Sequence, residues 1–388
     1  MARFRLREFG AHDARAVAAL HARTRPQCRW RSEAARAAYF VEALLGNPWT
    51  DPQLPSWIAE DEQGLVGFIG VMPRHMRLGT RPVRIAVACQ LMVDPARRAS
   101  LAALELMRRF FSGPQDLSVA DEANEVTRQC WEALGGTASP LHSLRWVRLL
   151  RPMQGALVLA STRPALRSVR RFAAPLAALV DACTPQRWTS RAGRALREDE
   201  LDPGALAAAM QDLRGGYTLR PHYDARSLEW LLHQTQEKRR DGPLHGCLLR
   251  EQGRLAGWFL YHLNAEMSRV LQIGARRERV AAVMQHLFQH ARARGAAAIE
   301  GRLEPHLVQG LKGSRCLLQS RGAATLVHAR DSGLLLPFLR GDALFTRLDG
   351  EWWMRFSGDA GSPSARVADT PPISRPASPA QSPGYSGY

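Results

Sequence analysis

Four carboxylates in the last quarter of the chain have the residue type and the position that general-base chemistry requires. Glu300 and Glu304 occur in "IEGRLEPHL", at the carboxyl end of an expected strand, and Asp349 and Glu351 occur in "LFTRLDGEWWMRF". Open α/β sheets commonly present ligands at the carboxyl ends of their strands. A carboxylate there can take a proton from an amine or a hydroxyl group. The alternative for each residue is an ion pair with a neighbouring arginine.

A basic loop is the second feature with a possible chemistry. "LMVDPARRASLAALELMRRFF", from Leu91 to Phe111, predicts a buried strand that ends at a proline and continues into a helix. The N-terminus of a helix attracts phosphate through its amides and its dipole. In such loops, glycines usually let the backbone approach the phosphates. This loop has no glycine, but Ala99, Ala102 and Ala103 give it small side chains. Arg97 and Arg98 add positive charge.

Histidine and cysteine patterns do not predict a metal site. His286 and His290 lie four residues apart and share a helix face, but they lack the adjacent glutamate of the H-E-x-x-H zinc motif. We expect them on a solvated polar face. The six cysteines are far apart and show no metal-ligand spacing; they are Cys28, Cys89, Cys130, Cys183, Cys247 and Cys316. A free thiol in an apolar element behaves as a small hydrophobe.

The composition argues against a dedicated nucleic-acid surface. The 388 residues carry a net charge of +17, but nearly all the positive residues are arginine, and Lys238 and Lys312 are the only lysines. This skew, together with abundant alanine, fits a coding bias better than a stripe of basic residues with interleaved aromatics. The N-terminal "MARFRLREFG" has no apolar run of the signal-peptide type, and no segment has the length of a membrane span. We expect a cytoplasmic protein.

The elements that would position these residues occur twice. "WIAEDEQGLVGFIGV" begins at Trp57 and "CLLREQGRLAGWFLYHL" begins at Cys247, and each predicts a hairpin with a glycine in its second strand. Each is followed by an apolar strand, a long amphipathic helix, a short strand and another helix. In the first helix the expected apolar stripe contains Leu101, Leu104, Met107 and Phe111. A shared series of this kind indicates an internal repeat.

The repeat predicts two α/β domains. We place the N-terminal domain at residues 1–152, a helical linker at 153–216, and the C-terminal domain at 217–356. The linker is rich in alanine and arginine and interrupted by prolines; its "RPALRSVRRFAAPLAAL" has the alternative of a basic membrane-surface helix. Residues 357–388 are dominated by proline, serine and glycine, which predicts a disordered tail.

The order of elements resembles that of the GNAT acyltransferases, and the resemblance extends to particular residues. The central strand of that family ends in V-x-P and is followed by Q/R-x-x-G-x-G/A, whose amides hold the pyrophosphate of acetyl-CoA. Val93, Pro95, Arg98 and Ala103 keep this spacing, whereas Leu101 stands in place of a glycine. "ANEVTRQCWEALGG" is similar to the family helix that begins with an asparagine, here Asn124.

The resemblance implies a mixed α/β fold, a tandem pair of GNAT-like domains, and acetyl-CoA or another acyl-CoA as co-substrate without a metal. The residues it assigns to the cofactor are Met92, Val93, Arg97, Arg98, Ala99, Ser100, Leu101, Ala102, Ala103 and Asn124. Many family members have a tyrosine acid where this chain has Trp131, whose indole nitrogen cannot serve as an acid. We expect Trp131 to pack on the cofactor-side helix.

Three functions remain open from the sequence. The first is acyl transfer from acyl-CoA to an amine or hydroxyl of a small-molecule or saccharide acceptor, with a base among Glu300, Glu304, Asp349 and Glu351. The second is an aminoacyl-tRNA-dependent transfer of the Fem type, because those enzymes also use two GNAT-like domains. The third is a binding or scaffold protein in which both copies have lost catalysis.

Overall fold

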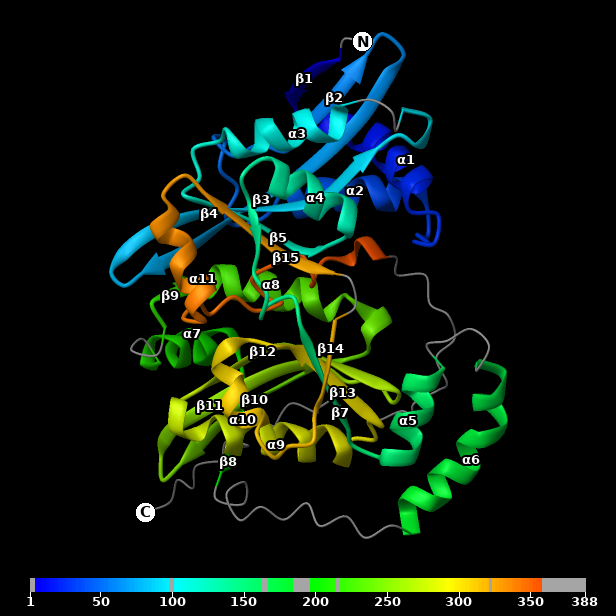
Figure 1. Ribbon diagram of the computed structural model, residues 1–388, viewed down its shortest axis with the longest axis vertical. Coiled ribbons are helices and arrows are strands. Elements are labelled where there is room, and N and C mark those ends of the chain that lie inside the picture. Colours follow the sequence, from blue (N-terminus) through cyan, green and yellow to red (C-terminus); the bar gives the residue numbers. More distant parts are fainter. Residues whose placement is uncertain are drawn as a thin grey trace, which may run out of the picture.

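The computed structural model describes residues 4–97, 101–161, 167–183, 196–213, 217–320 and 323–357. Arg98, Ala99 and Ser100 of the basic loop, and the tail predicted to be disordered, lie outside this range apart from residue 357. Two mixed sheets form the molecule, one above the other in Figure 1. No helix among the described residues is long and apolar enough to cross a membrane.

The first sheet has the strand order β1-β2-β3-β4-β5-β15-β6, with β9 paired to an extension of β3. Its strands are β1 (Arg5–Glu8), β2 (Trp57–Asp61), β3 (Gly64–Leu78), β4 (Arg81–Val93), β5 (Leu117–Ala123), β6 (Thr137–Ala138), β9 (Leu219–Pro221) and β15 (Ala324–Ala329). Among these, β4 and β5 are the parallel pair and the other pairings are antiparallel.

The second sheet has the order β14-β7-β13-β12-β11-β10-β8, and its parallel pair is β12 with β13. Its strands are β7 (Arg145–Leu149), β8 (Arg197–Glu200), β10 (Leu244–Glu251), β11 (Arg254–His262), β12 (Met267–Ala275), β13 (Ala298–Arg302) and β14 (Leu317–Gln319). The helices are α1 (Ala14–Thr24), α2 (Glu33–Leu44), α3 (Ala102–Phe111), α4 (Glu125–Ala133), α5 (Pro152–Ala160), α6 (Arg167–Cys183), α7 (Pro203–Asp212), α8 (Ala225–Gln236), α9 (Val280–Ala293), α10 (Val308–Leu311) and α11 (Leu336–Arg340).

The predicted repeat is present in the structure. The hairpin β2–β3, then β4, α3, β5 and α4 correspond in order to the hairpin β10–β11, then β12, α9, β13 and α10. One detail of the prediction is wrong, because Leu101 is 47% exposed and Leu104 is half-buried. Met107 and Phe111 are buried as predicted, and the helix also buries Ala102, Leu106 and Phe110.

The two sheets exchange one strand each. β7 precedes the predicted boundary at Pro152, yet it pairs with β13 in the second sheet. β15 belongs to the end of the chain, yet it pairs with β5 in the first sheet. The two exchanged strands occupy equivalent places, each next to the second strand of a parallel pair, as the teal β7 and the orange β15 of Figure 1 illustrate. The predicted linker also contains β8, an edge strand of the second sheet.

A shared apolar core lies between the sheets. It contains side chains from one face of each sheet, from α1 and α2, from α7 and α8, and from the C-terminal segment at residues 343–356. On the far side of the first sheet, α3 and the Trp131 side chain of α4 close a smaller core. On the far side of the second sheet, α9 closes a third core. Because helices and the C-terminal segment cover both faces, the central strands are apolar on both sides.

The glycines noted in the two hairpins lie where a long helix approaches the sheet. A Cβ added to Gly257 would lie 2.4 Å from the Gly274 carbonyl oxygen and 2.9 Å from Val283 Cγ2 of α9. A Cβ on Gly67 would lie 3.0 Å from Leu106 Cδ1 of α3 and 3.0 Å from the Met92 carbonyl oxygen. A glycine is therefore required at both positions, and the space for a larger side chain is smaller at Gly257 than at Gly67.

Replacing these glycines should therefore destabilise the protein to different degrees. We expect Gly257→Ala to lower the free energy of unfolding by about 1–3 kcal/mol, the cost of forcing extra volume into a packed core, and Gly67→Ala to lower it by less. Urea unfolding of both variants and the parent would measure this order. A Gly257→Ala protein as stable as its parent would contradict the close approach of α9.

Candidate functional site

The parallel strands β4 and β5 separate before they end. Their pairing runs from Ile85 and Leu117 to Ala88 and Ala120, whereas β4 continues to residue 93 and β5 to residue 123. Just beyond the last pair, one residue of each strand has a positive φ: Gln90 in β4, at 49°, and Glu122 in β5, at 63°. Residues other than glycine rarely adopt this conformation, so both strands bend at one level and open a V between them.

A cleft of about 520 Å³ occupies this opening. Its apolar walls come from the small side chains of the two strands and from α3 and α4, and its polar groups come from α1, the strand ends and the C-terminal segment. The lining residues are His21, Arg25, Gln27, Cys28, Ile69, Ala88, Cys89, Gln90, Leu91, Met107, Ala120, Asp121, Glu122, Ala123, Asn124, Thr127, Trp131, Glu351 and Phe356.

Glu351 is the predicted catalytic residue that reaches the cleft. Its Oε2 atom is buried and has no hydrogen-bond partner among the described residues. Burial raises the pKa of this carboxyl to about 8, and the charge of Glu122 adds to the rise. Hydrogen bonds from the backbone and side chain of Gln90 lower the pKa in part. The group therefore changes charge near neutral pH, as a proton acceptor for an amine should.

The C-terminal segment that carries Glu351 is firmly anchored. Trp353, Met354 and Phe356 are all at most 3% exposed. The Phe356 ring lies 4.5 Å from that of Phe40 in α2, centroid to centroid. The Met354 amide donates to the Glu351 carbonyl over 2.9 Å. Because the backbone on the C-terminal side of Glu351 is fixed by the shared core, the carboxyl cannot move far from the cleft.

Two other titratable groups of the cleft, His21 and Cys89, are held neutral. Burial lowers the pKa of His21 to about 4, with a further contribution from Arg36. Burial raises the pKa of the Cys89 thiol well above its usual value, and Glu351 raises it further. Neither group supplies a cation or a thiolate at neutral pH. This leaves Glu351 as the better candidate for proton transfer, in preference to a cysteine nucleophile.

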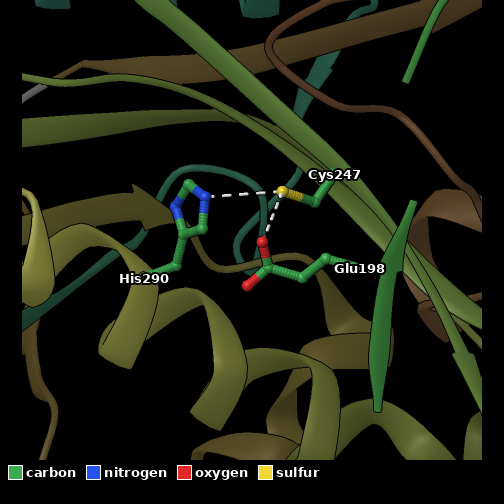
Figure 2. Close-up of side chains that lie close together, drawn as sticks. All are labelled: Glu198, Cys247 and His290. Atoms are coloured by element: carbon green, nitrogen blue, oxygen red, sulfur yellow. Dashed lines mark hydrogen bonds between the residues drawn. The ribbon is translucent and has the colours of Figure 1, made fainter. Parts of the chain in front are cut away.

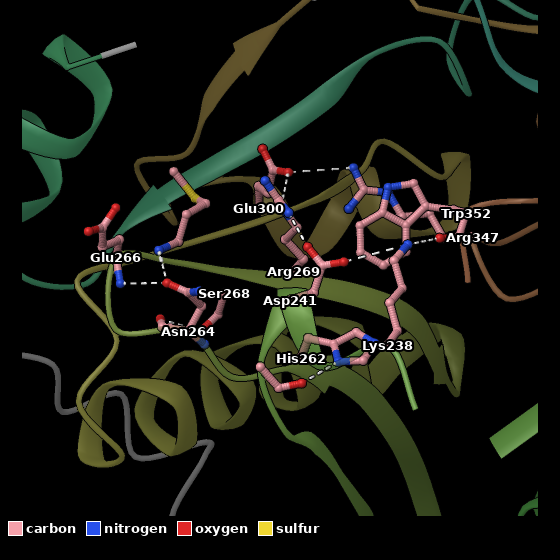
Figure 3. A network of polar contacts seen from close by, with 12 residues as sticks. Lys238, Asp241, His262, Asn264, Glu266, Ser268, Arg269, Glu300, Arg347 and Trp352 are labelled. Atoms are coloured by element: carbon pink, nitrogen blue, oxygen red, sulfur yellow. Dashed lines mark hydrogen bonds and ion pairs between the residues drawn. The ribbon is translucent and has the colours of Figure 1, made fainter. Parts of the chain in front are cut away.

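The other three predicted bases do not line the cleft, and Glu300 and Asp349 have structural partners. Glu300 is buried among three arginines, with Oε1 at 3.3 Å from Arg269 Nε and 3.8 Å from both Arg145 Nη1 and Arg347 Nη2. Figure 3 shows the extension of this network through Asp241 to Lys238. The ion-pair alternative therefore describes Glu300.

Asp349 and Glu304 are buried behind the cleft. The Asp349 Oδ2 atom accepts from the Thr346 amide at 2.6 Å and from Thr346 Oγ1 at 2.7 Å, and Tyr223 donates to its other oxygen. These contacts close a turn. Burial raises the pKa of Glu304 well above its usual value. Its Oε2 atom is 3.6 Å from His306 Nε2 and has no hydrogen-bond partner among the described residues, but Glu304 does not line the cleft.

Of the described residues predicted to bind the cofactor, Asn124 alone lines the cleft, and the described ends of the predicted phosphate loop follow β4, whose Gln90 and Leu91 also line it. Asn124 lines the cleft and caps α4 by accepting from the Thr127 amide at 2.9 Å. Arg97 binds Asp61 and Gln63 of the β2–β3 turn. Met92 and Ala102 are buried, Val93 and Ala103 are half-buried, and Leu101 is exposed. The role of these residues in binding a cofactor stays a prediction.

No family model and no curated protein matches the sequence, so the informative comparisons are structural. A GCN5-related N-acetyltransferase from Anabaena variabilis is similar, with a TM-score of 0.53 at 12% identity over 84% of this chain and 72% of that one. One from Kribbella flavida has a TM-score of 0.52 at 14% identity over 85% and 72%. A conserved protein of unknown function from Enterococcus faecalis, "Probable N-Acyltransferase", has a TM-score of 0.53 at 9% identity over 88% and 74%.

The chain has the GNAT acyltransferase fold. The prediction of that fold from the sequence is confirmed. Trp131, in the place where many GNAT members have a tyrosine, is 1% exposed and packs edge-on against Phe111 with ring centroids 4.7 Å apart. Its Nε1 donates to the Val327 carbonyl of β15 at 3.2 Å. The prediction that Trp131 is a packing residue is confirmed, because its ring contacts Phe111 of α3. Its N–H group is already engaged in the hydrogen bond to Val327.

The parallel pair of the second sheet also separates before its strands end, but a side chain crosses the opening. Pairing of β12 with β13 ends at Arg269 and Glu300. His306, just after β13, bonds through Nε2 to the Ile273 carbonyl of β12 at 3.2 Å, across the opening. Burial lowers the pKa of His306 to about 4, so it is a neutral donor at this position. The open slot is thus a property of the first sheet.

Several cleft residues were not identified from the sequence. Gln90, Glu122, His21 and Cys89 belong to no motif, and their positions depend on strand geometry and on the packing of α1. The V-x-P pattern of Val93 and Pro95 indicates where β4 ends. Nothing in the sequence indicates that the backbone bends at Gln90.

The raised pKa of Glu351 predicts a pH-dependent stability. The folded protein keeps a proton on Glu351 up to about pH 8, whereas an unfolded glutamate loses it near 4.5. Stability of the parent relative to Glu351→Gln should therefore fall as the pH rises through this window and level off above it. Urea unfolding of both proteins at several pH values would measure the difference. A difference that does not change with pH would mean that the carboxyl is solvated.

Proposed function

We propose that the protein is an acyl-CoA-dependent acyltransferase that acts on an amine or hydroxyl of a small-molecule or saccharide acceptor. The observation that carries the proposal is the split of β4 from β5 beyond Ala88 and Ala120, which opens a cleft that contains the Glu351 carboxyl. The likeness to N-acetyltransferases supports the same reaction class but not a particular acceptor.

The slot suits the pantetheine arm of CoA. Beyond Ala88, β4 no longer pairs with β5, and backbone groups seek hydrogen-bond partners. An extended chain with amide groups can add to such an edge as a further strand does. Ala88, Ala120 and Ala123 give the slot apolar walls with small side chains that leave room for the arm. The N-terminus of α3 follows the end of β4 in the chain, and the amides and dipole of a helix N-terminus attract phosphates.

Proton transfer is the role that Glu351 fits. In acyl transfer the acceptor nitrogen or oxygen bonds to the thioester carbon, the carbon–sulfur bond breaks, and the acceptor loses one proton. The Glu351 Oε2 atom, buried and unpartnered among the described residues, can take that proton. The thiolate of CoA leaves and is protonated by water, because the N–H group of Trp131 is bonded to Val327.

Two variants separate the role of the Glu351 carboxylate from that of Glu122. We expect Glu351→Gln to lower turnover with acetyl-CoA and a panel of amines by about 100-fold or more, with CoA affinity unchanged, because a general base contributes about 10²–10⁴-fold. The parent rate should rise with pH through about 8. Glu122→Gln should shift this rise to lower pH, because the charge of Glu122 raises the pKa of Glu351. Full activity of Glu351→Gln would refute the assignment.

Filling the slot should block the co-substrate. Ala123 is the last residue of β5 and lines the cleft, and its partner on β15, Ala324, does not. Ala123→Leu should weaken binding to immobilised CoA by about tenfold or more, the effect of added volume in a close-fitting site. Ala324→Leu is the matched control and should bind like the parent.

The other two functions are outcomes of these measurements. Binding of tRNA but not CoA by the parent, with no effect of Ala123→Leu, would favour the aminoacyl-tRNA-dependent transfer. Binding of CoA with no turnover for any acyl-CoA and acceptor would favour a binding protein.

A further inference from the structure

Three side chains with metal-binding atoms converge at the edge of the second sheet, away from the acyltransferase cleft (Figure 2). They come from three elements: Glu198 from β8, Cys247 from β10 and His290 from α9. Their donor atoms all lie within 4.8 Å of one another. The solvated face expected for the histidines is wrong for His290, which is 5% exposed, and Cys247 is 7% exposed.

The surrounding hydrogen bonds aim the donor atoms at one point. His290 Nδ1 bonds to the Tyr261 hydroxyl at 2.8 Å, and its Nε2 faces Cys247 Sγ at 3.4 Å. His286 Nε2 bonds to Glu198 Oε1 at 2.7 Å, and the other carboxylate oxygen, Oε2, lies 3.9 Å from the same sulfur. Ligating histidines and carboxylates in metal sites are usually oriented by such outer partners.

We propose that Glu198, Cys247 and His290 bind a zinc ion. A thiolate, an imidazole and a carboxylate are the ligands that zinc takes in proteins, with bonds of about 2.0–2.3 Å. In a tetrahedral site those bonds place the donor atoms roughly 3.3–3.6 Å apart. The sulfur lies 3.4 Å from His290 Nε2 and 3.9 Å from Glu198 Oε2, and the third separation is within 4.8 Å, so the carboxylate is the ligand that must move toward the other two. Glu198 is exposed, so a water molecule can reach the fourth position from its side.

The ion would fasten an edge strand. Among the described strands, β8 pairs with β10 alone, through four residue pairs that include Glu198 with Leu249. A metal joining β8 to β10 and to α9 would add a bond between the edge strand and the helix that covers it. Its role is then structural, and it is separate from the proposed acyl transfer, whose cleft lies in the other sheet.

Cobalt and zinc titrations of the full-length, metal-stripped protein test this site. Cobalt bound to a thiolate gives a sulfur-to-metal charge-transfer absorption, which reports directly on a cysteine ligand. We expect one equivalent of Co²⁺ to produce this absorption and one equivalent of Zn²⁺ to displace it. Absence of the absorption in the parent would overturn the proposal.

Variants assign the ligands. Cys247→Ser should abolish the absorption, and Cys316→Ser, at a half-buried cysteine of the same half, should keep it. Glu198→Gln, at an exposed position that does not threaten folding, should weaken zinc binding more than about 100-fold. Tyr261→Phe should weaken it about tenfold, since loss of an outer partner costs about 10–100-fold. Zinc affinity equal to that of the parent in both Cys247→Ser and Glu198→Gln would place the metal elsewhere and refute the site.

Discussion

The reciprocal exchange of β7 and β15 is the constraint on which the rest of the structure depends. The first sheet is extended past β5 by a strand from the end of the chain, and the second is extended past β13 by a strand from its first half. An unpaired strand edge is costly and prone to association, so neither sheet is complete without the other half. The exchange also fixes the route of the chain, because residues after β15 must return between the two sheets.

That route explains why Glu351 differs from the other carboxylates. Glu300 and Asp349 are buried with partners that stabilise their charge or accept hydrogen bonds, and a buried pair is costly to break. The first sheet contributes a similar contact, in which Asp121 of β5 binds the buried Arg302 of β13. Glu351, in contrast, faces Glu122 and has no cationic partner in a salt bridge among the described residues. A carboxyl left in this state is costly for stability and useful for proton transfer.

Much of the fold could be predicted from the sequence because its signals are local. The two hairpins, the amphipathic α3 and α9, and the capping Asn124 follow from periodicity and turn residues within short segments. The exchange of β7 and β15 could not be predicted in this way. Both segments are short strands with several acceptable neighbours. β7 pairs with a strand about 150 residues away and β15 with one about 200 residues away, and such pairing leaves no local pattern.

The functional sites could also be predicted only where the signal in the sequence is local. Glu351 was among the candidates because of its residue type, but its choice over Glu300 depends on which sheet the C-terminal segment contacts. The metal-binding cluster was missed because its residues are 49 and 43 positions apart, counting from Glu198 to Cys247 and from Cys247 to His290. Spacing rules detect ligands that share a loop or a helix turn, and these ligands come from two strands and a helix.

The two repeated series of elements differ in a way that their packing explains. The opening between β4 and β5 faces alanine side chains and stays available, whereas His306 crosses the corresponding opening in the second sheet. The second copy is also the one with the tighter glycine contact under its long helix and with Glu300 held among arginines. In the second sheet the opening is crossed by His306 and Glu300 is paired with arginines, so these residues have a structural role. The second copy can hold the C-terminal segment against the first sheet, so that one copy offers the slot and the other fixes the carboxylate within it.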